Sequence, residues 1–170
     1  MRRVLLTGMS GAGKSTAIAA LAARGYRAVD ADCDEYSHWV AVSPDEADIP
    51  GSPVEADRDW VWREDRIQAL LATDAANILF LGGCAANMRG FLPQFDEVIL
   101  LSAPAEVIVE RLATRTTNPY GKRPAEVARA LELIETVEPL LRRIATHEID
   151  TSAPLDEMVA SILRLAQAES

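Results

Sequence analysis

The sequence predicts an α/β fold, namely a three-layer α/β/α sandwich around a five-stranded parallel sheet. Short runs rich in Val, Ile and Leu alternate with longer helix-like segments, which is typical of parallel strands connected by helices. The runs lack the alternation of apolar and polar residues found in a half-exposed sheet, so helices are expected on both faces. The predicted strands are residues 4–7, 26–29, 78–81, 98–101 and 147–149.

The helices are predicted from apolar residues at helical spacing between these runs. Ser102 and Pro104 supply a cap and a first-turn proline for the third helix, and Pro139 interrupts or kinks the fourth. No internal repeat or break in composition divides the chain, so residues 1–170 are expected to form one domain. The predicted helices are residues 17–24, 57–72, 103–115, 124–146 and 154–168.

A phosphate-binding loop joins the first strand to the first helix. Residues 8–15 have the sequence Gly-Met-Ser-Gly-Ala-Gly-Lys-Ser, which matches G-x-x-x-x-G-K-S in its usual strand-to-helix setting. Glycines let backbone N–H groups wrap a polyphosphate, the lysine reaches the β- and γ-phosphates, and the serine hydroxyl binds Mg²⁺. The predicted nucleotide-binding residues here are Gly8, Met9, Ser10, Gly11, Ala12, Gly13, Lys14, Ser15 and Thr16, with Ser15 also on the metal.

The composition favours a small-molecule enzyme over other classes. A formal charge of −9 opposes a broad nucleic-acid or anionic-membrane surface. Cys33 and Cys84 are too few for a disulfide framework or a zinc site, and no apolar stretch reaches the length of a membrane span. The apolar run after Met1 is too short for a signal peptide. We therefore expect a cytoplasmic enzyme, monomeric or homodimeric, with no nucleic-acid or membrane partner.

Polar residues and glycines follow the second and third strands, where ligands bind in parallel sheets. Asp30, Asp32 and Asp34 alternate along an extended segment and are expected to face one site, as ligands of Mg²⁺ and partners of a hydroxyl. A solvated acidic turn is the alternative. Residues 82–84, Gly-Gly-Cys, are expected to bring backbone amides close to a ligand, and a plain tight turn is the alternative there.

Two stretches without periodicity, residues 43–56 and 116–122, are expected to be binding loops or a lid, or else variable surface loops. Basic residues gather around the second stretch, and mobile arginines that close over a γ-phosphate would stabilise its charge. The tryptophans gather near the first, either in the core or as a stacking surface for a ring-shaped substrate. The basic residues are Arg111, Arg115, Lys122, Arg123, Arg142 and Arg143, and the tryptophans are Trp39, Trp60 and Trp62.

Together these residues resemble the small P-loop kinases of the shikimate kinase and nucleoside monophosphate kinase group, with shikimate kinase the nearest family. The resemblance covers essentially all 170 residues and implies a P-loop NTPase fold of the nucleoside monophosphate kinase-like type. It is carried by the phosphate loop, by a D-x-D after the second strand, and by an aromatic-Arg pair, Trp62-Arg63. It implies an acceptor-binding segment over residues 34–66 and a lid over residues 112–124.

The resemblance also implies individual roles. Asp30 is expected to serve Mg²⁺ through water, and Asp32, Lys14, Arg115 and Arg123 to act in catalysis. Adenine contacts are expected from the region of Arg111, Ser152 and Pro154. The residues expected to bind the acceptor are Asp32, Arg63, Gly82, Gly83, Cys84 and Arg142.

This chain also departs from the family pattern. Arg66 stands where the family has an acidic residue, Cys84 replaces a third glycine, and residues 34–62 do not resemble the family's acceptor-binding helices. The sequence therefore predicts an ATP- and Mg²⁺-dependent kinase that phosphorylates a hydroxyl of a small polar or anionic, shikimate-like acceptor. A nucleoside or nucleotide kinase is the first alternative, and an ATP-binding regulatory module without acceptor phosphorylation is the second.

Overall fold

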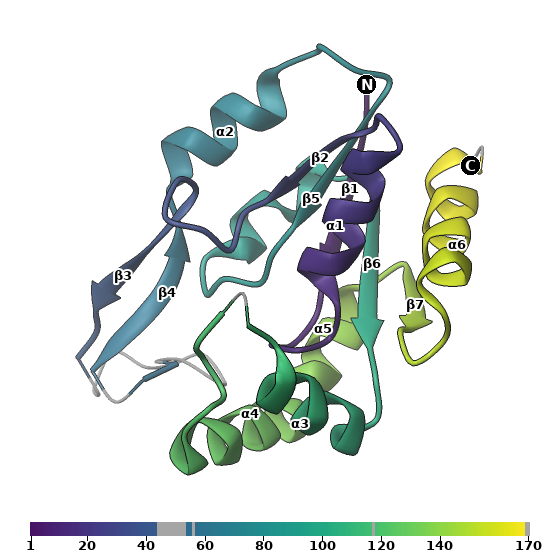
Figure 1. The fold of residues 1–170 in the computed structure, drawn as a ribbon. Coiled ribbons are helices and arrows are strands. Elements are labelled where there is room, and N and C mark those ends of the chain that lie inside the picture. Colours follow the sequence, from purple (N-terminus) through teal and green to yellow (C-terminus); the bar gives the residue numbers. More distant parts are fainter. Residues whose placement is uncertain (44–53, 56, 117, 169–170) are drawn as a thin grey trace.

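The five predicted strands form one parallel sheet with the spatial order β2-β5-β1-β6-β7 (Figure 1). The computed structural model describes residues 1–43, 54–55, 57–116 and 118–168. In the central strand, Val4 pairs with Phe80 of one neighbour and with Glu97 of the other. The sheet strands are β1 (Arg2–Thr7), β2 (Arg27–Asp30), β5 (Ile78–Gly82), β6 (Glu97–Ser102) and β7 (His147–Asp150).

Helices cover both faces of this sheet, as the sequence predicts. The helices are α1 (Lys14–Ala23), α2 (Glu64–Ala72), α3 (Ala105–Thr114), α4 (Pro124–Thr136), α5 (Glu138–Ile144) and α6 (Leu155–Gln167). One core cluster joins the sheet to α1 and α6, through residues such as Ile18 and Ile162. The other joins the opposite face to α2 and α5, through residues such as Ile67 and Leu141. The expected break of the fourth helix lies at Val137, where α4 gives way to α5, with Pro139 in the first turn of α5.

The prediction of one helix over residues 57–72 is wrong in its first third. Residues Arg58–Trp62 form strand β4, which pairs antiparallel with β3 (Ser37–Ala41), and only Glu64–Ala72 is helical. The apolar side chains of Trp60 and Val61 suit either period over so short a stretch. Cross-strand pairing of Trp39 with Trp60 favours the hairpin, because aromatic pairs stabilise facing positions of two strands.

The β3–β4 hairpin extends from the sheet toward the side on which α3 and α4 lie (Figure 1). Two residues of the segment after β5, Asn87 and Ala86, are hydrogen-bonded to the base of the hairpin. The Asn87 side chain accepts from the Trp62 N–H at 2.8 Å and donates to its carbonyl at 3.0 Å, and the Ala86 N–H donates to the Trp60 carbonyl at 3.1 Å. The hairpin thereby becomes one wall of the space beyond the sheet. Of the predicted loop 43–56, residues 44–53 and 56 lie outside the described residues.

Residues Met88–Gln94, which directly follow Asn87, form a 3₁₀ helix, η2. The glycine and Pro93 in this segment suggest a loop, so the sequence analysis does not predict the helix. Its residues Met88 and Phe91 are buried against the core. No helix in the part of the chain that the structure describes is long and apolar enough to cross a membrane.

Candidate active site

The phosphate loop lies at the carboxyl end of β1, and its backbone conformation depends on glycine. Gly13 has a φ of 102° and precedes α1, which has no side-chain cap on its first N–H groups. A Cβ at Gly8 would lie 2.3 Å from the Leu101 carbonyl oxygen, so a side chain there would displace the neighbouring strand. The uncapped positive end of α1 therefore faces the space where an anion binds.

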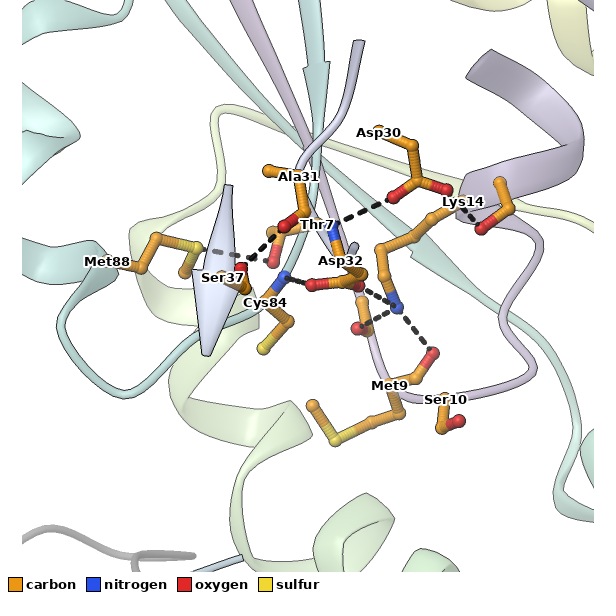
Figure 2. Close-up of polar contacts among 12 residues, drawn as sticks. Thr7, Met9, Ser10, Lys14, Asp30, Ala31, Asp32, Ser37, Cys84 and Met88 are labelled. Carbon is orange, nitrogen blue, oxygen red and sulfur yellow. Dashed lines mark hydrogen bonds and ion pairs between the residues drawn. The ribbon is translucent and has the colours of Figure 1, made fainter. Parts of the chain in front are cut away.

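Lys14 lies inside this loop and also faces the acidic segment after β2 (Figure 2). Its ammonium donates to the Gly8 carbonyl at 2.7 Å and to the Met9 carbonyl at 3.0 Å, and the residue is only 8% exposed. The same ammonium lies 3.9 Å from the Asp32 carboxylate. One cation therefore joins the phosphate loop to the first acidic residue beyond the sheet.

Asp32 faces a cavity and is held from two sides. Its carboxylate accepts from the Cys84 N–H at 3.3 Å, and 27% of its side-chain surface stays exposed. Desolvation raises the pKa of Asp32, while the charge of Lys14 opposes that shift. A carboxylate in this setting accepts a hydrogen bond from an incoming hydroxyl well, because few water molecules compete for it.

Ser15 and Asp30 lie side by side, as the prediction of a shared metal site requires. The Ser15 hydroxyl donates to Asp30 Oδ2 at 2.6 Å. The Asp32 N–H donates to Asp30 Oδ1 at 2.9 Å (Figure 2). These are hard oxygen ligands, and Mg²⁺ is usually held by one or two such groups together with water and phosphate oxygens. The residues present therefore fit Mg²⁺.

The expectation that Asp30, Asp32 and Asp34 share one site is wrong in part. Asp32 and Asp34 line the cavity, whereas Asp30 turns to Ser15. Among the residues described, no three acidic, His or Cys side chains form a group that could hold a metal. The reason is a turn directly after β2, marked by the bond from the Asp32 N–H to Asp30 Oδ1 at 2.9 Å, which ends the extended conformation.

The lid arginine Arg115 reaches the phosphate loop. Its guanidinium donates to the Tyr120 carbonyl at 2.7 Å and to the Ser10 hydroxyl at 3.4 Å, and desolvation lowers its pKa. The Arg115 Nε is buried and has no hydrogen-bond partner among the described residues. Lys122 is turned toward the lid backbone, donating to the carbonyls of Ala113 and Arg115 at 2.7 and 2.6 Å. Arg115 therefore has a spare donor beside the loop.

Arg123 lies at the start of α4, on the cavity wall. Its N–H donates to the Glu126 carboxylate at 3.1 Å, and the Gly121 N–H donates to the same carboxylate at 3.0 Å. Glu126 therefore fixes the end of the lid to the first turn of α4, a common use of an acidic residue at this position.

Arg111 and the loop after β7 meet behind the phosphate loop. Arg111 donates to the hydroxyl and carbonyl of Thr151 at 2.9 and 2.6 Å, and to the Gly11 carbonyl at 3.3 Å. Ser152 and Pro154 follow on the exposed side of this loop, and Thr16 is exposed in the first turn of α1. Arg111, the loop after β7 and the phosphate loop are therefore brought together, as the predicted nucleotide site requires.

A cavity of about 980 Å³ opens beside the phosphate loop, between the β3–β4 hairpin, the lid and the α4–α5 pair. Four of the predicted acceptor-binding residues are absent from its described lining, namely Arg63, Gly82, Gly83 and Arg142. The predicted site residues that line it are Gly8, Met9, Ser10, Lys14, Asp32, Cys84 and Arg123.

Contacts with other parts of the protein explain why these four residues are absent from the described lining of the cavity. A Cβ at Gly82 would lie 2.6 Å from the Ile18 side chain, and one at Gly83 would lie 3.1 Å from Trp62 Nε1, so both glycines make room for packing. Arg63 donates from Nε to the Asp34 carbonyl at 3.0 Å. Arg142 donates to the carboxylates of Glu138 and Glu148 at 2.9 to 3.0 Å.

Three residues of this region are missed by the sequence analysis. Thr151 is buried and donates to the Ala12 carbonyl at 2.6 Å, Asn87 holds the hairpin, and Tyr120 lines the cavity from the lid. Thr151 directly precedes Ser152, from whose region adenine contacts are expected, so its neighbour pointed to it. Asn87 has no sequence signal, because its role depends on strand β4, where the sequence predicts a helix.

The three tryptophans, expected either in the core or on a stacking surface, lie in two different places. Trp62 is only 1% exposed and packs edge-on against Phe91, so it belongs to the core. Trp39 and Trp60 line the cavity, with ring centroids 5.1 Å apart. Core packing therefore accounts for Trp62, whereas Trp39 and Trp60 lie on the cavity wall.

Known proteins match this chain over most of their own length. Shikimate kinase 2 of Yersinia enterocolitica (serotype O:8 / biotype 1B) is 30% identical over 98% of this chain and 96% of its own. Shikimate kinase of Rhodopseudomonas palustris is 31% identical over 95% of this chain and 81% of its own. The structure of shikimate kinase from Acinetobacter baumannii in complex with shikimate matches with a TM-score of 0.63, at 23% identity over 97% of this chain and 92% of that one.

The family comparison agrees with the geometry. The AAA domain family matches residues 4–132, which include the phosphate loop, the acidic segment after β2 and all of the segment predicted as the lid. The matched residues cover more than half of the chain, and the shikimate kinases above match its remainder too. The chain belongs to the AAA domain family and, within it, is a P-loop kinase of the shikimate kinase-like group of small-molecule phosphotransferases.

Proposed function

We propose that this kinase transfers the γ-phosphoryl group of ATP to a hydroxyl of a small molecule bound in the cavity. The observation that carries the proposal is the 3.9 Å separation between the Lys14 ammonium and the Asp32 carboxylate. Lys14 belongs to the phosphate loop and Asp32 faces the cavity, so donor and acceptor sites meet at this pair. Phosphoryl transfer depends mainly on such positioning and on charge stabilisation.

The nucleotide would be held from three sides. Backbone N–H groups of residues 8–15 and the N-terminus of α1 surround the phosphates, and Lys14 exchanges its contacts with the Gly8 and Met9 carbonyls for phosphate oxygens. Arg111 and the loop carrying Thr151 and Ser152 lie behind the phosphate loop, where the nucleoside would extend.

Ser15 and Asp30 would hold Mg²⁺, Asp30 through a water molecule. When bound, the metal supplies positive charge to the β- and γ-phosphate oxygens. The 2.6 Å contact between the Ser15 hydroxyl and Asp30 supports this assignment, because both oxygens already lie beside the end of the phosphate loop, at the start of α1.

Asp32 would orient the acceptor. Its carboxylate accepts a hydrogen bond from the acceptor hydroxyl, whose oxygen forms a bond to the γ-phosphorus while the bond from that phosphorus to the β–γ bridging oxygen breaks. The hydroxyl proton passes to Asp32, and ADP leaves with the former bridging oxygen. Lys14 stabilises the charge that moves toward ADP.

Arg115 and Arg123 would close the site from the lid. Arg115 donates from Nη2 to the Ser10 hydroxyl, its Nε has no partner among the described residues, and Arg123 lines the cavity next to Lys122. Their guanidinium groups would neutralise the charge on the transferring group and exclude water, which would otherwise accept the phosphoryl group.

The experiment that tests the proposal measures ADP release from Mg-ATP with a panel of shikimate, gluconate, other sugar acids, nucleosides and nucleoside monophosphates. We expect acceptor-stimulated turnover that is lost in Lys14→Met and falls at least about 100-fold in Asp32→Asn, as general-base contributions do. ATP binding by the Asp32→Asn protein should persist. An unchanged rate in Lys14→Met would contradict the proposal.

The same panel distinguishes the two alternatives. Stimulation confined to nucleosides or nucleoside monophosphates would make the protein a nucleotide kinase. ATP and ADP binding without stimulation by any acceptor would favour a regulatory ATP-binding module.

A further inference from the structure

Part of the cavity has an apolar wall. Five aliphatic side chains of α4, α5 and their junction line it, and Leu141 among them is buried in the core. These residues are Leu133, Val137, Leu140, Leu141 and Ile144. A small, highly hydrated sugar acid gains nothing from such a wall, whereas an apolar ring gains about 25 cal/mol for each Å² of its surface removed from water.

The hairpin supplies an aromatic wall to the same cavity. Trp39 and Trp60 occupy directly opposite positions of β3 and β4, and the Arg58 guanidinium lies 4.2 Å from the centroid of the Trp39 ring. Trp39 is 37% exposed, unusually high for a tryptophan, because its surface borders the cavity. Stacking on an aromatic ligand would cover it.

The charges of the lining disfavour an anionic acceptor. The described lining holds five carboxylates, on Asp32, Asp34, Glu55, Asp59 and Glu126. Four basic side chains also belong to the described lining. Lys14 is part of the phosphate loop, and Lys122 and Arg123 are part of the lid. Arg89 is the remaining basic residue that could meet an acceptor.

The two arginines expected to hold an acceptor carboxylate lie off the described wall. Arg142 is bound by Glu138 and Glu148, and Arg63 donates to the Asp34 carbonyl. The described lining therefore offers an acceptor carboxylate five acidic and four basic side chains, and of those four only Arg89 lies outside the phosphate loop and the lid.

The lid adds one polar group that points to a ligand. The Tyr120 hydroxyl is buried and has no hydrogen-bond partner among residues 1–43, 54–55, 57–116 and 118–168. A buried hydroxyl without a partner costs free energy, so a ligand that completes its hydrogen bond is favoured. Desolvation raises the pKa of Tyr120, which keeps the hydroxyl protonated as a donor.

The volume agrees with a large acceptor. Small-molecule pockets span about 300 to 1,000 Å³, and the cavity, at about 980 Å³, lies at the upper end of that range. We propose that the acceptor is an alcohol with an apolar, ring-containing body and no anionic group, stacked between the Trp39–Trp60 pair and the α4–α5 wall. This inference rests on the proposed function for the position of the reacting hydroxyl.

Isothermal titration calorimetry with three matched probes tests the inference without requiring turnover. Phenyl β-D-glucoside carries the ring and no charge, phenyl β-D-glucuronide adds one carboxylate, and methyl β-D-glucoside lacks the ring. We expect the phenyl glucoside to bind at least 10-fold more tightly than either of the others. Equal or tighter binding of the glucuronide, or no difference between phenyl and methyl glucosides, would overturn it, as would absence of binding by all three.

Variants locate the site. Trp39→Ala should weaken phenyl glucoside binding at least 5-fold while leaving Mg-ATP binding unchanged, whereas Arg164→Ala should change neither. Arg164 is the control because it is exposed near the end of α6, outside the described lining of the cavity. Unchanged glucoside binding in Trp39→Ala would contradict the stacking.

ADP release with the same probes separates this inference from the proposed function. Phenyl glucoside binding without stimulated turnover would sustain the acceptor class and count against phosphoryl transfer. Turnover with shikimate or gluconate but not with neutral aryl alcohols would support phosphoryl transfer and contradict the proposed acceptor class.

Discussion

The Arg111 guanidinium donates to both oxygens of Thr151, at 2.9 Å to the hydroxyl and 2.6 Å to the carbonyl. The Thr151 hydroxyl donates in turn to the Ala12 carbonyl at 2.6 Å. Three segments far apart in sequence, namely the phosphate loop, α3 and the loop after β7, are therefore joined through one buried side chain. Because this residue touches the back of the loop, it sets the loop geometry that phosphates meet.

Thr151→Val should weaken Mg-ATP binding about 5- to 20-fold and lower the free energy of unfolding by about 1–2 kcal/mol. Valine keeps the shape of threonine but leaves the Ala12 carbonyl and one Arg111 donor without a partner, and buried unsatisfied groups cost about that much. Calorimetric titration and urea unfolding measure the two effects. Thr114→Val is the control, since the Thr114 hydroxyl bonds only within the exposed end of α3. Wild-type ATP affinity in Thr151→Val would contradict the role.

Asp30→Asn should raise the Mg²⁺ concentration needed for half-maximal activity about 10-fold, while activity at saturating Mg²⁺ falls less. The amide keeps one oxygen and the shape of the side chain but removes the charge that attracts the cation. Activity titrated with Mg²⁺ at fixed ATP measures the shift. Asp156→Asn is the control, because the Asp156 side chain is 90% exposed on α6. An unshifted Mg²⁺ curve for Asp30→Asn would remove Asp30 from the metal site.

The sheet and the phosphate loop could be predicted from the sequence because their signals are local. Uninterrupted apolar runs indicate buried parallel strands, and all five predicted strands are found. The loop is specified by a fixed spacing of glycines, lysine and serine. The strand order, in contrast, came from the resemblance, because the pattern of runs carries no information on which strands are neighbours.

The acceptor side could not be predicted in the same way, because long-range contacts decide it. Whether residues 58–62 form a strand depends on pairing with residues 37–41 and on the bonds from Asn87. Arg142 occupies a motif position expected to contact the acceptor, but Glu148, six residues further on, accepts two of its hydrogen bonds. A motif fixes where the backbone is, and the neighbouring charges then decide where the side chain points.

Gly82→Ala should lower the free energy of unfolding by about 1–3 kcal/mol, the usual cost of overpacking a filled core. The added Cβ would lie 2.6 Å from Ile18 Cγ1 and force α1 or the Ile18 side chain to move. Urea unfolding measures the change in stability. The control Gly90→Ala should change the free energy of unfolding by no more than about 0.5 kcal/mol, because nothing lies within 4 Å of a Cβ there. A Gly82→Ala protein of wild-type stability with an altered acceptor KM would favour a substrate contact over packing.

Glu148→Gln should lower stability by less than about 1 kcal/mol at pH 7, and this difference should shrink below about pH 4.3, the ordinary pKa of glutamate. Arg142 holds the pKa of Glu148 below that value, with a smaller contribution from Ser102. A depressed folded-state pKa means that the unfolded chain binds the proton first. The stabilisation is therefore present above the unfolded pKa and is lost as the pH falls through the folded one.

Urea unfolding of both proteins at pH 7, 5 and 3.5 measures the change, with Glu135→Gln on the exposed surface of α4 as the control. A gap between wild type and Glu148→Gln that is as large at pH 3.5 as at pH 7 would mean that the ionised pair is not its source. The bond from the Ser102 hydroxyl to Glu148, at 2.8 Å, would not explain such a gap either, since glutamine still accepts that bond.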